Sequence, residues 1–182
     1  MKIIVLVKQV PDTTEVRLDP KTGNLIREGV ESIINPDDLH ALEAAVALKE
    51  KAGGRITVLS MGPPQAIDAV SEAMGMGADE GILLSDRAFA GADTWATSST
   101  LGKAIEKVGA FDIVFAGRQA IDGDTAQIGP QVADYLGIPQ VTYVCEIEGV
   151  TKKSLVAKRR LEDGYERVRC DLPAMLTVIG EL

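Results

Sequence analysis

Short segments that are apolar at successive positions alternate along this chain with longer segments whose apolar residues recur every three or four positions. The short pattern is typical of strands covered on both faces, and the longer period is typical of amphipathic helices. Strands are expected at residues 3–8, 55–61, 81–84 and 112–116, and a helix is expected to follow each of them. This order predicts βαβ units and therefore an α/β fold, with helices packed on a mostly parallel sheet.

Start and stop residues mark the ends of the first helix. Asn35 is expected to cap it, with Pro36 at its first position and two aspartates at the positive end of its dipole. The glycine pair 53–54 is expected to end it. Residues 12–34 precede it, and their turn signals favour a short hairpin that pairs residues 16–18 with residues 25–27.

The chain from Gln140 onward contains only strand patterns. These are expected at residues 141–147, 154–161, 165–170 and 175–179. We expect them to add antiparallel strands to one edge of the sheet. Since no linker or repeat interrupts the chain, residues 1–182 are predicted to form a single domain whose β-rich part covers about 140–182.

Charge and cysteine content narrow the classes of partner. The net charge is −8, and the longest basic cluster is residues 158–160, which argues against a nucleic-acid partner. No apolar run approaches the roughly 18 residues of a membrane span, and the first one is too short for a signal peptide. Cys145 and Cys170 stand alone in strand-like segments, which favours buried, reduced thiols and a cytoplasmic location.

Polar loops follow the predicted parallel strands, at the sheet edge where open α/β folds bind ligands. The segments that should meet there are residues 8–13, 61–64, 85–97 and 117–127, all rich in Gly, Pro, Asp and Thr. The last belongs to the sequence G-R-Q-A-I-D-G-D-T-A-Q-I-G. Its glycines allow close backbone approach, Arg118 adds positive charge, and a helix start offers free N–H groups, so it is a candidate phosphate site.

The start of the fourth helix is ambiguous. Asp124 and Gln127 have the spacing of a capping box, but Pro130 would then lie inside the second turn. Either the helix is kinked at Pro130 or its regular part begins near residues 129–130. Asp122 and Asp124 are either turn and cap residues beside a phosphate or, less favourably, a pair of Mg²⁺ ligands.

Motifs of several enzyme classes are missing from the sequence. There is no Walker A sequence, and residues 75–81 are glycine-rich but follow a helix, the reverse of the dinucleotide fingerprint. One histidine and two distant cysteines do not make a catalytic triad or a zinc site. The sequence therefore predicts a binding site without catalytic residues or metal ligands, in which a cofactor would carry any chemistry.

Five motifs occur together in one order: V-K-Q-V-P-D (7–12), N-P-D-D (35–38), M-G-P (61–63), M-G-A-D (76–79) and G-R-Q-A-I-D-G-D-T-A-Q (117–127). Together they resemble the beta (small) subunit of electron transfer flavoprotein over essentially the whole chain. The resemblance implies a Rossmann-like domain of the adenine-nucleotide-binding type, paired with an alpha subunit that carries a redox-active FAD.

The resemblance also implies a pocket for AMP as a structural ligand or for a second FAD. Its residues, carried over by position, are Leu6, Asn35, Pro36, Asp37, Asp38, Met61, Arg118, Gln119, Ala120, Ile121, Asp122, Gly123, Asp124, Thr125, Ala126, Gln127, Ile128 and Gly129. The strand and the Asn35 helix start would hold the adenosine, and residues 123–127 the phosphates.

The loop at residues 86–98 resembles the branch whose beta subunit binds FAD, including electron-bifurcating members that oxidise NADH and reduce ferredoxin. Gly91, Asp93, Thr94 and Thr97 would offer amides and hydroxyls to a pyrophosphate or flavin there. Alternatively, Asp93 is only a helix cap and the hydroxyls face solvent. In this family the electrons pass through the alpha-subunit FAD to an acyl-CoA dehydrogenase or a quinone reductase.

The chain differs from the family pattern at residues 179–182. Relatives continue there with an N-E-P-R-Y stretch, a lysine-rich segment and an arm around the alpha subunit. Two other functions stay open: a single-flavin carrier with structural AMP, and a nucleotide-binding regulator without electron transfer, whose glycine-rich helix start is absent here. An ATP-pyrophosphatase ligase is excluded, because its S-G-G-x-D-S loop after the first strand is replaced by V-K-Q-V-P.

Overall fold

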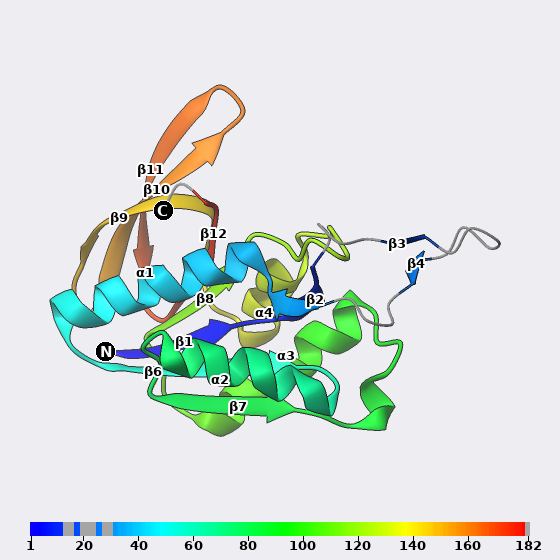
Figure 1. Ribbon diagram of the computed structural model, residues 1–182. Coiled ribbons are helices and arrows are strands. Elements are labelled where there is room, and N and C mark those ends of the chain that lie inside the picture. The colour runs from blue at the N-terminus through cyan, green and yellow to red at the C-terminus, as the bar shows by residue number, and fades with distance from the viewer. Residues whose placement is uncertain (13–16, 19–24, 27–30, 181–182) are drawn as a thin grey trace.

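The computed structural model describes residues 1–12, 17–18, 25–26 and 31–180, and its centre is a twisted sheet (Figure 1). Eight strands of the described residues form this sheet in the order β11-β10-β9-β12-β8-β1-β6-β7. They are β1 (Lys2–Leu6), β6 (Arg55–Met61), β7 (Glu80–Leu84), β8 (Ile113–Gly117), β9 (Gln140–Val150), β10 (Ser154–Leu161), β11 (Gly164–Asp171) and β12 (Ala174–Val178). Strands β9, β12, β8, β1, β6 and β7 run parallel.

Helices cover both faces of the parallel strands. Helices α1 (Pro36–Ala52) and α2 (Ile67–Gly75) pack on one face, against residues such as Ile3 and Val5. Helices α3 (Thr94–Val108) and α4 (Ile128–Leu136) pack on the other, against Ile4 and Leu6. Successive residues of β1 thus enter opposite cores, which explains its unbroken apolar run. The predicted α/β fold with a mostly parallel, Rossmann-like sheet is confirmed.

The chain connections leave a crevice between β1 and β8. From β1 the chain passes through α1 to β6 and through α2 to β7, both on one side of β1. The connection through α3 then returns to β8, which pairs with β1 on its other side. Adjacent strands whose connections leave in opposite directions form a topological switch point, and open α/β sheets bind their ligands there.

The C-terminal strands differ in part from the expected arrangement. Strands β10 and β11 form an antiparallel hairpin at the edge of the sheet, as expected, and this hairpin projects from the body of the protein (Figure 1). In contrast, β12 returns to the interior and lies parallel between β8 and β9. All five of its residues are buried, whereas β11 is largely exposed. A strand that is apolar on both faces needs cover on both, and next to β8 the faces of β12 are covered by α1 and α4.

Shorter elements complete the described fold. β3 (Arg17–Leu18) pairs antiparallel with β4 (Leu25–Ile26), which confirms the predicted hairpin, although Val16 and Arg27 lie outside the described residues. A second pair, β2 (Gln9–Pro11) with β5 (Ser32–Ile34), was not expected. Two 3₁₀ turns, η2 (Pro64–Ala66) and η3 (Arg87–Phe89), precede α2 and α3.

Both cysteines are buried and neither forms a disulfide, as predicted. A search of the described helices finds none long and apolar enough to cross a membrane.

Candidate functional site

A cavity of about 840 Å³ lies at the carboxyl ends of the parallel strands, beside the switch point. It is lined by the end of β1 and by the segments that follow β6, β7 and β8. Parts of all four polar loops singled out in the sequence therefore meet around one cavity, as predicted. Its size is typical of small-molecule and cofactor sites.

Most of the predicted binding residues line this cavity. They are Leu6, Asp38, Met61, Gly91, Asp93, Thr94, Thr97, Arg118, Gln119, Ala120, Gly123, Asp124, Thr125, Ala126, Gln127, Ile128 and Gly129. The predicted residues that do not line it are Asn35, Pro36, Asp37, Ile121 and Asp122. Pro36 begins α1, as expected, whereas Asn35, Asp37 and Asp122 each contact a cavity-lining residue and the Ile121 N–H is bonded to Asn35.

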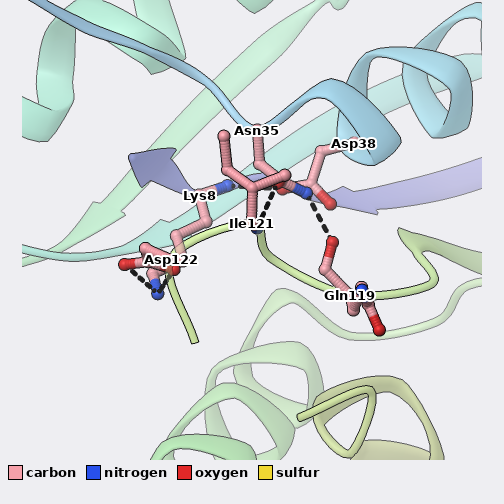
Figure 2. A network of polar contacts seen from close by, with 6 residues as sticks. All are labelled: Lys8, Asn35, Asp38, Gln119, Ile121 and Asp122. Atoms are coloured by element: carbon pink, nitrogen blue, oxygen red, sulfur yellow. Dashed lines mark hydrogen bonds and ion pairs between the residues drawn. The ribbon is translucent and has the colours of Figure 1, made fainter. Parts of the chain in front are cut away.

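Asn35 anchors the loop after β8 and does not cap its own helix with its side chain. The fully buried side chain donates from Nδ2 to the Gln119 carbonyl at 2.9 Å and accepts at Oδ1 from the Ile121 N–H at 3.0 Å (Figure 2). Asn35 therefore lies at the N-cap position, as expected, but the expected side-chain cap is wrong. The asparagine satisfies two backbone groups of a loop more than 80 residues away, and a buried amide gains more from such partners than from an exposed cap.

Asp38 ties together the ends of β1 and β8 at the switch point. One carboxylate oxygen accepts from the Lys8 N–H at 2.8 Å and the other from the Gly117 N–H at 3.0 Å. Burial raises the pKa of this carboxyl from 3.8 to about 7, and the hydrogen bonds from Lys8, Asn35 and Gly117 oppose that rise only in part. Asp38 is therefore a buried acid that titrates near neutral pH.

The acidic residues Asp122 and Asp124 are each engaged by a neighbour. The Lys8 ammonium lies 2.6 Å and 2.8 Å from the two carboxylate oxygens of Asp122 (Figure 2). The Asp124 carboxylate accepts a hydrogen bond from the Gln119 side-chain amide. A pair of acids beside an anion site would repel the anion, and the Lys8 contact offsets this for Asp122.

Asp124 is not the cap of the fourth helix, which corrects the capping-box prediction. Helix α4 begins at Ile128, with Gln127 at its N-cap position and no side-chain cap. Pro130 therefore lies in the first turn, where its missing N–H breaks no intrahelical bond, and this resolves the conflict noted in the sequence. The uncapped backbone N–H groups at this helix start are available to an anion in the adjoining cavity.

The loop before α4 has an unusual backbone. Asp124 and Ala126 have φ of 54° and 53°, the left-handed region that non-glycine residues rarely adopt. Gln127 between Ala126 and the helix is right-handed. Alternation of the two forms turns successive N–H groups toward one side, an arrangement that binds anions, and strained residues of this kind cluster at functional sites.

Arg118 faces both the cavity and the start of α1. Its Nε lies 3.6 Å from Asp37 Oδ2, and its side chain also lines a second, more open groove behind the loop. The charge of the Arg118 guanidinium is therefore partly offset by the Asp37 carboxylate, which weakens its attraction for an anionic ligand. Direct contact of Arg118 with a phosphate stays a prediction.

The loop after β7 reaches the same cavity as the loop after β8. Asp93 caps α3 by accepting from the Ala96 N–H at 2.8 Å, which fits the alternative noted in the sequence for this side chain. The Thr94 hydroxyl does not face only solvent, because it donates to Gln127 Oε1 at 2.9 Å and accepts from Gln131 at 3.3 Å. This contact joins the starts of α3 and α4 on one wall of the cavity.

Sequence reasoning missed three cavity residues with useful chemistry: Lys8, Arg87 and Phe89. Lys8 is the last residue of the predicted strand 3–8 and lies just after β1 in the structure, so its place at the predicted ligand edge was a signal. Arg87 and Phe89 belong to the D-R-A-F-A-G segment and place a cation and an aromatic ring at the cavity. Gly129, in contrast, is a packing residue, because a Cβ there would collide with Thr177 of β12.

The fold and the cavity define an α/β protein with a cavity beside the switch point of a Rossmann-like sheet. A family model described as the electron transfer flavoprotein domain matches residues 22–182.

The beta subunit of electron transfer flavoprotein from Thermoanaerobacterium thermosaccharolyticum is 63% identical over the whole chain, which spans 69% of that relative. The beta subunit from Clostridium acetobutylicum is 61% identical over the whole chain and 70% of the relative. The caffeyl-CoA reductase-Etf complex subunit CarD of Acetobacterium woodii is 58% identical, with the same shares covered. The chain belongs to the electron transfer flavoprotein family.

Proposed function

We propose that this chain is the beta subunit of a heterodimeric electron transfer flavoprotein and binds FAD in the cavity at the switch point. It would accept electrons from NADH and pass them by bifurcation to ferredoxin and, through the alpha-subunit FAD, to an acyl-CoA dehydrogenase or a quinone reductase. Membership of the family and the beta-subunit relatives support the electron-transfer role over a nucleotide-binding regulator.

The observation that carries the FAD assignment is the continuity of the cavity. The α4 helix start and the loop around Gly91 line one space of about 840 Å³. AMP needs only the part near residues 123–127 and α1. The same space is also lined by Thr94, Arg87 and Phe89, which would give a second phosphate and a flavin ring both a cation and an aromatic neighbour.

The residues present fit a dinucleotide in their charge and their backbone. The uncapped N–H groups at α4 would bind a phosphate, and a Cβ on the neighbouring Gly123 would meet no atom within 4 Å. Lys8 would hold Asp122 away from the phosphate, and Thr94 would fix the two loops relative to each other. Bound FAD would supply the one- and two-electron chemistry, while the chain binds and orients it.

The names of relatives support the choice of electron acceptor. Relatives include the caffeyl-CoA reductase-Etf complex subunit and the acryloyl-CoA reductase electron transfer subunit gamma of Anaerotignum propionicum, which is 50% identical to this chain. Both names connect a protein of this kind with reduction of an unsaturated acyl-CoA. We place the chain in the cytoplasm, since Cys145 and Cys170 form no disulfide, which suits a reducing compartment.

Substitutions in the Lys8–Asp122 pair test whether Lys8 favours nucleotide binding by neutralising the Asp122 carboxylate. Lys8→Gln leaves the Asp122 carboxylate unpaired near the cavity, so we expect nucleotide affinity to fall by about tenfold, the effect of roughly 1.4 kcal/mol. Asp122→Asn removes that charge, and affinity should stay at or above the wild-type value. Titration with FAD at low and high salt measures both variants. The difference between them should shrink at high salt, and equal affinities at low salt would contradict the role given to Lys8.

Gly91 tests the choice between FAD and AMP. Its φ is 77°, so Gly91→Val forces the loop after β7 out of its conformation, while residues 123–127 and α4 stay intact. Gly53→Val is a matched control, because Gly53 has φ of 70° at the end of α1 and does not line the cavity.

The readout is the ratio of FAD to AMP released after reconstitution with the alpha subunit and both nucleotides. We expect Gly91→Val to lower this ratio at least about fivefold, the effect of roughly 1 kcal/mol, and Gly53→Val to leave it unchanged. A wild-type protein that takes up AMP and excludes FAD would replace the proposal by the single-flavin carrier.

A further inference from the structure

Asp38 is a buried carboxyl group without a cationic partner among the described residues. It is 7% exposed, and its oxygens accept from neutral donors: the backbone N–H groups of Lys8 and Gly117 and the side-chain amide of Asn35. Buried carboxylates are usually paired with a cation, because burial removes the water that stabilises their charge. Asp93 and Asp124, which also line the cavity, accept from neutral donors as well, but they are exposed, so Asp38 differs from them in being buried.

The two cations near Asp38 are engaged elsewhere. The Lys8 ammonium pairs with Asp122, and the Arg118 guanidinium lies against Asp37. The neighbouring Asp37 carboxylate adds a like charge, which disfavours ionisation of Asp38. The charged groups at the end of the sheet where Asp38 lies are Lys8 just after β1, Asp37 on α1, and Arg118, Asp122 and Asp124 in the loop after β8. His40, also on α1, lies against Gly180 instead.

Asp38 lines the cavity in which we place the nucleotide. A phosphate that enters this cavity adds negative charge near a carboxylate that no cation compensates. The least costly response is protonation of the carboxyl, because a protonated carboxyl keeps lone pairs for the two N–H groups that it holds. The strand ends then stay in place while the charge is removed.

We propose that Asp38 takes up a proton when a phosphate-bearing nucleotide binds in the cavity. The proposal rests on the proposed function, which places the nucleotide there. Since burial already raises the pKa of Asp38 to about 7, a further rise on binding makes proton uptake largest just above neutral pH. By linkage, nucleotide affinity falls as pH rises through the same range, by at most about tenfold per pH unit for one proton.

The stability of the nucleotide-free protein should depend on the same group. Between the unfolded value of 3.8 and the folded value of about 7, Asp38 is protonated in the folded chain and ionised in the unfolded chain. The contribution of Asp38 to the free energy of unfolding therefore falls as pH rises from about 4 to about 7. Asp38→Asn should lack this contribution.

The test is calorimetric titration of AMP into the nucleotide-stripped complex of this chain with its alpha subunit, at pH 7.5. Two buffers of different ionisation enthalpy give the number of protons taken up per AMP. The phosphate of AMP has a pKa near 6, so its own contribution is small and common to all variants. We expect about 0.3 to 0.8 of a proton for the wild type and close to zero for Asp38→Asn.

Asp37→Asn is the matched charge variant, one residue away on the same helix. It should keep the proton uptake, with its maximum shifted to lower pH, because a like charge is removed. If Asp38→Asn does not fold, the deciding measurement is the pH at which Asp37→Asn takes up the most protons on binding AMP. If this pH is the same as in the wild type, the proposal is overturned. AMP binding without proton uptake in the wild type overturns the proposal alone, whereas absence of AMP binding overturns the proposed nucleotide site as well.

Discussion

Replacing Gly117 with alanine should lower the free energy of unfolding by about 3 kcal/mol, the upper range for overpacking a core. Gly117 ends β8 directly under the first turn of α1. A Cβ there would lie 2.5 Å from Asp38 Oδ1 and 2.6 Å from the backbone carbon of Asp37. The added Cβ would force α1 away from β8, against the packing that holds the helix on the sheet. This movement should also open the cavity and weaken nucleotide binding.

Gly123→Ala is the control for this prediction. Gly123 lies six residues further along the same loop, lines the cavity, and has nothing within 4 Å of an added Cβ. Its substitution should change the free energy of unfolding by less than about 0.5 kcal/mol. Urea unfolding of both variants measures the difference. Equal stabilities would show that the close approach of α1 to β8 does not constrain Gly117.

Replacing Asn35 with alanine should cost about 2–4 kcal/mol of stability and release the loop after β8. The substitution leaves the Gln119 carbonyl and the Ile121 N–H without their side-chain partner, and each unsatisfied group costs about 1–3 kcal/mol when it stays out of water. Hydrogen exchange at the Ile121 amide reports the release directly. We also expect retention of bound nucleotide to fall.

Asn35→Asp separates the two bonds that Asn35 makes. Aspartate keeps an oxygen acceptor for the Ile121 N–H but faces the Gln119 carbonyl with a second oxygen in place of a donor. Its cost should be at least that of Asn35→Ala, because it places an uncompensated carboxylate in a fully buried position, but the Ile121 amide should still be protected. Wild-type exchange at this amide in Asn35→Ala would contradict the anchoring role.

The sequence predicts the fold well because hydrophobic period and strand order are local signals. The strands at 55–61 and 154–161 have the same bounds in the structure as in the sequence prediction. The ligand edge was also predictable, because the carboxyl ends of parallel strands always meet at one side of the sheet. The interior place of β12 was missed, although the uninterrupted burial of A-M-L-T-V is the pattern expected of a covered strand.

Individual side-chain roles were harder to predict, because they depend on contacts between distant segments. Asn35 has the sequence context of a cap, yet its partners are at 119 and 121. Asp124 has capping-box spacing, but Pro130 requires a helix that begins at Ile128. The Lys8–Asp122 pair joins residues 114 positions apart, which no local motif in one sequence reveals.

Identification of the nucleotide held by the purified complex tests the central claim most directly. The chain, expressed with its alpha subunit, is denatured, and the released nucleotides are identified by mass and quantified by absorbance. The account predicts two FAD molecules per heterodimer and no stoichiometric AMP, with the second FAD lost selectively in Gly91→Val. One FAD together with one AMP per heterodimer would contradict it.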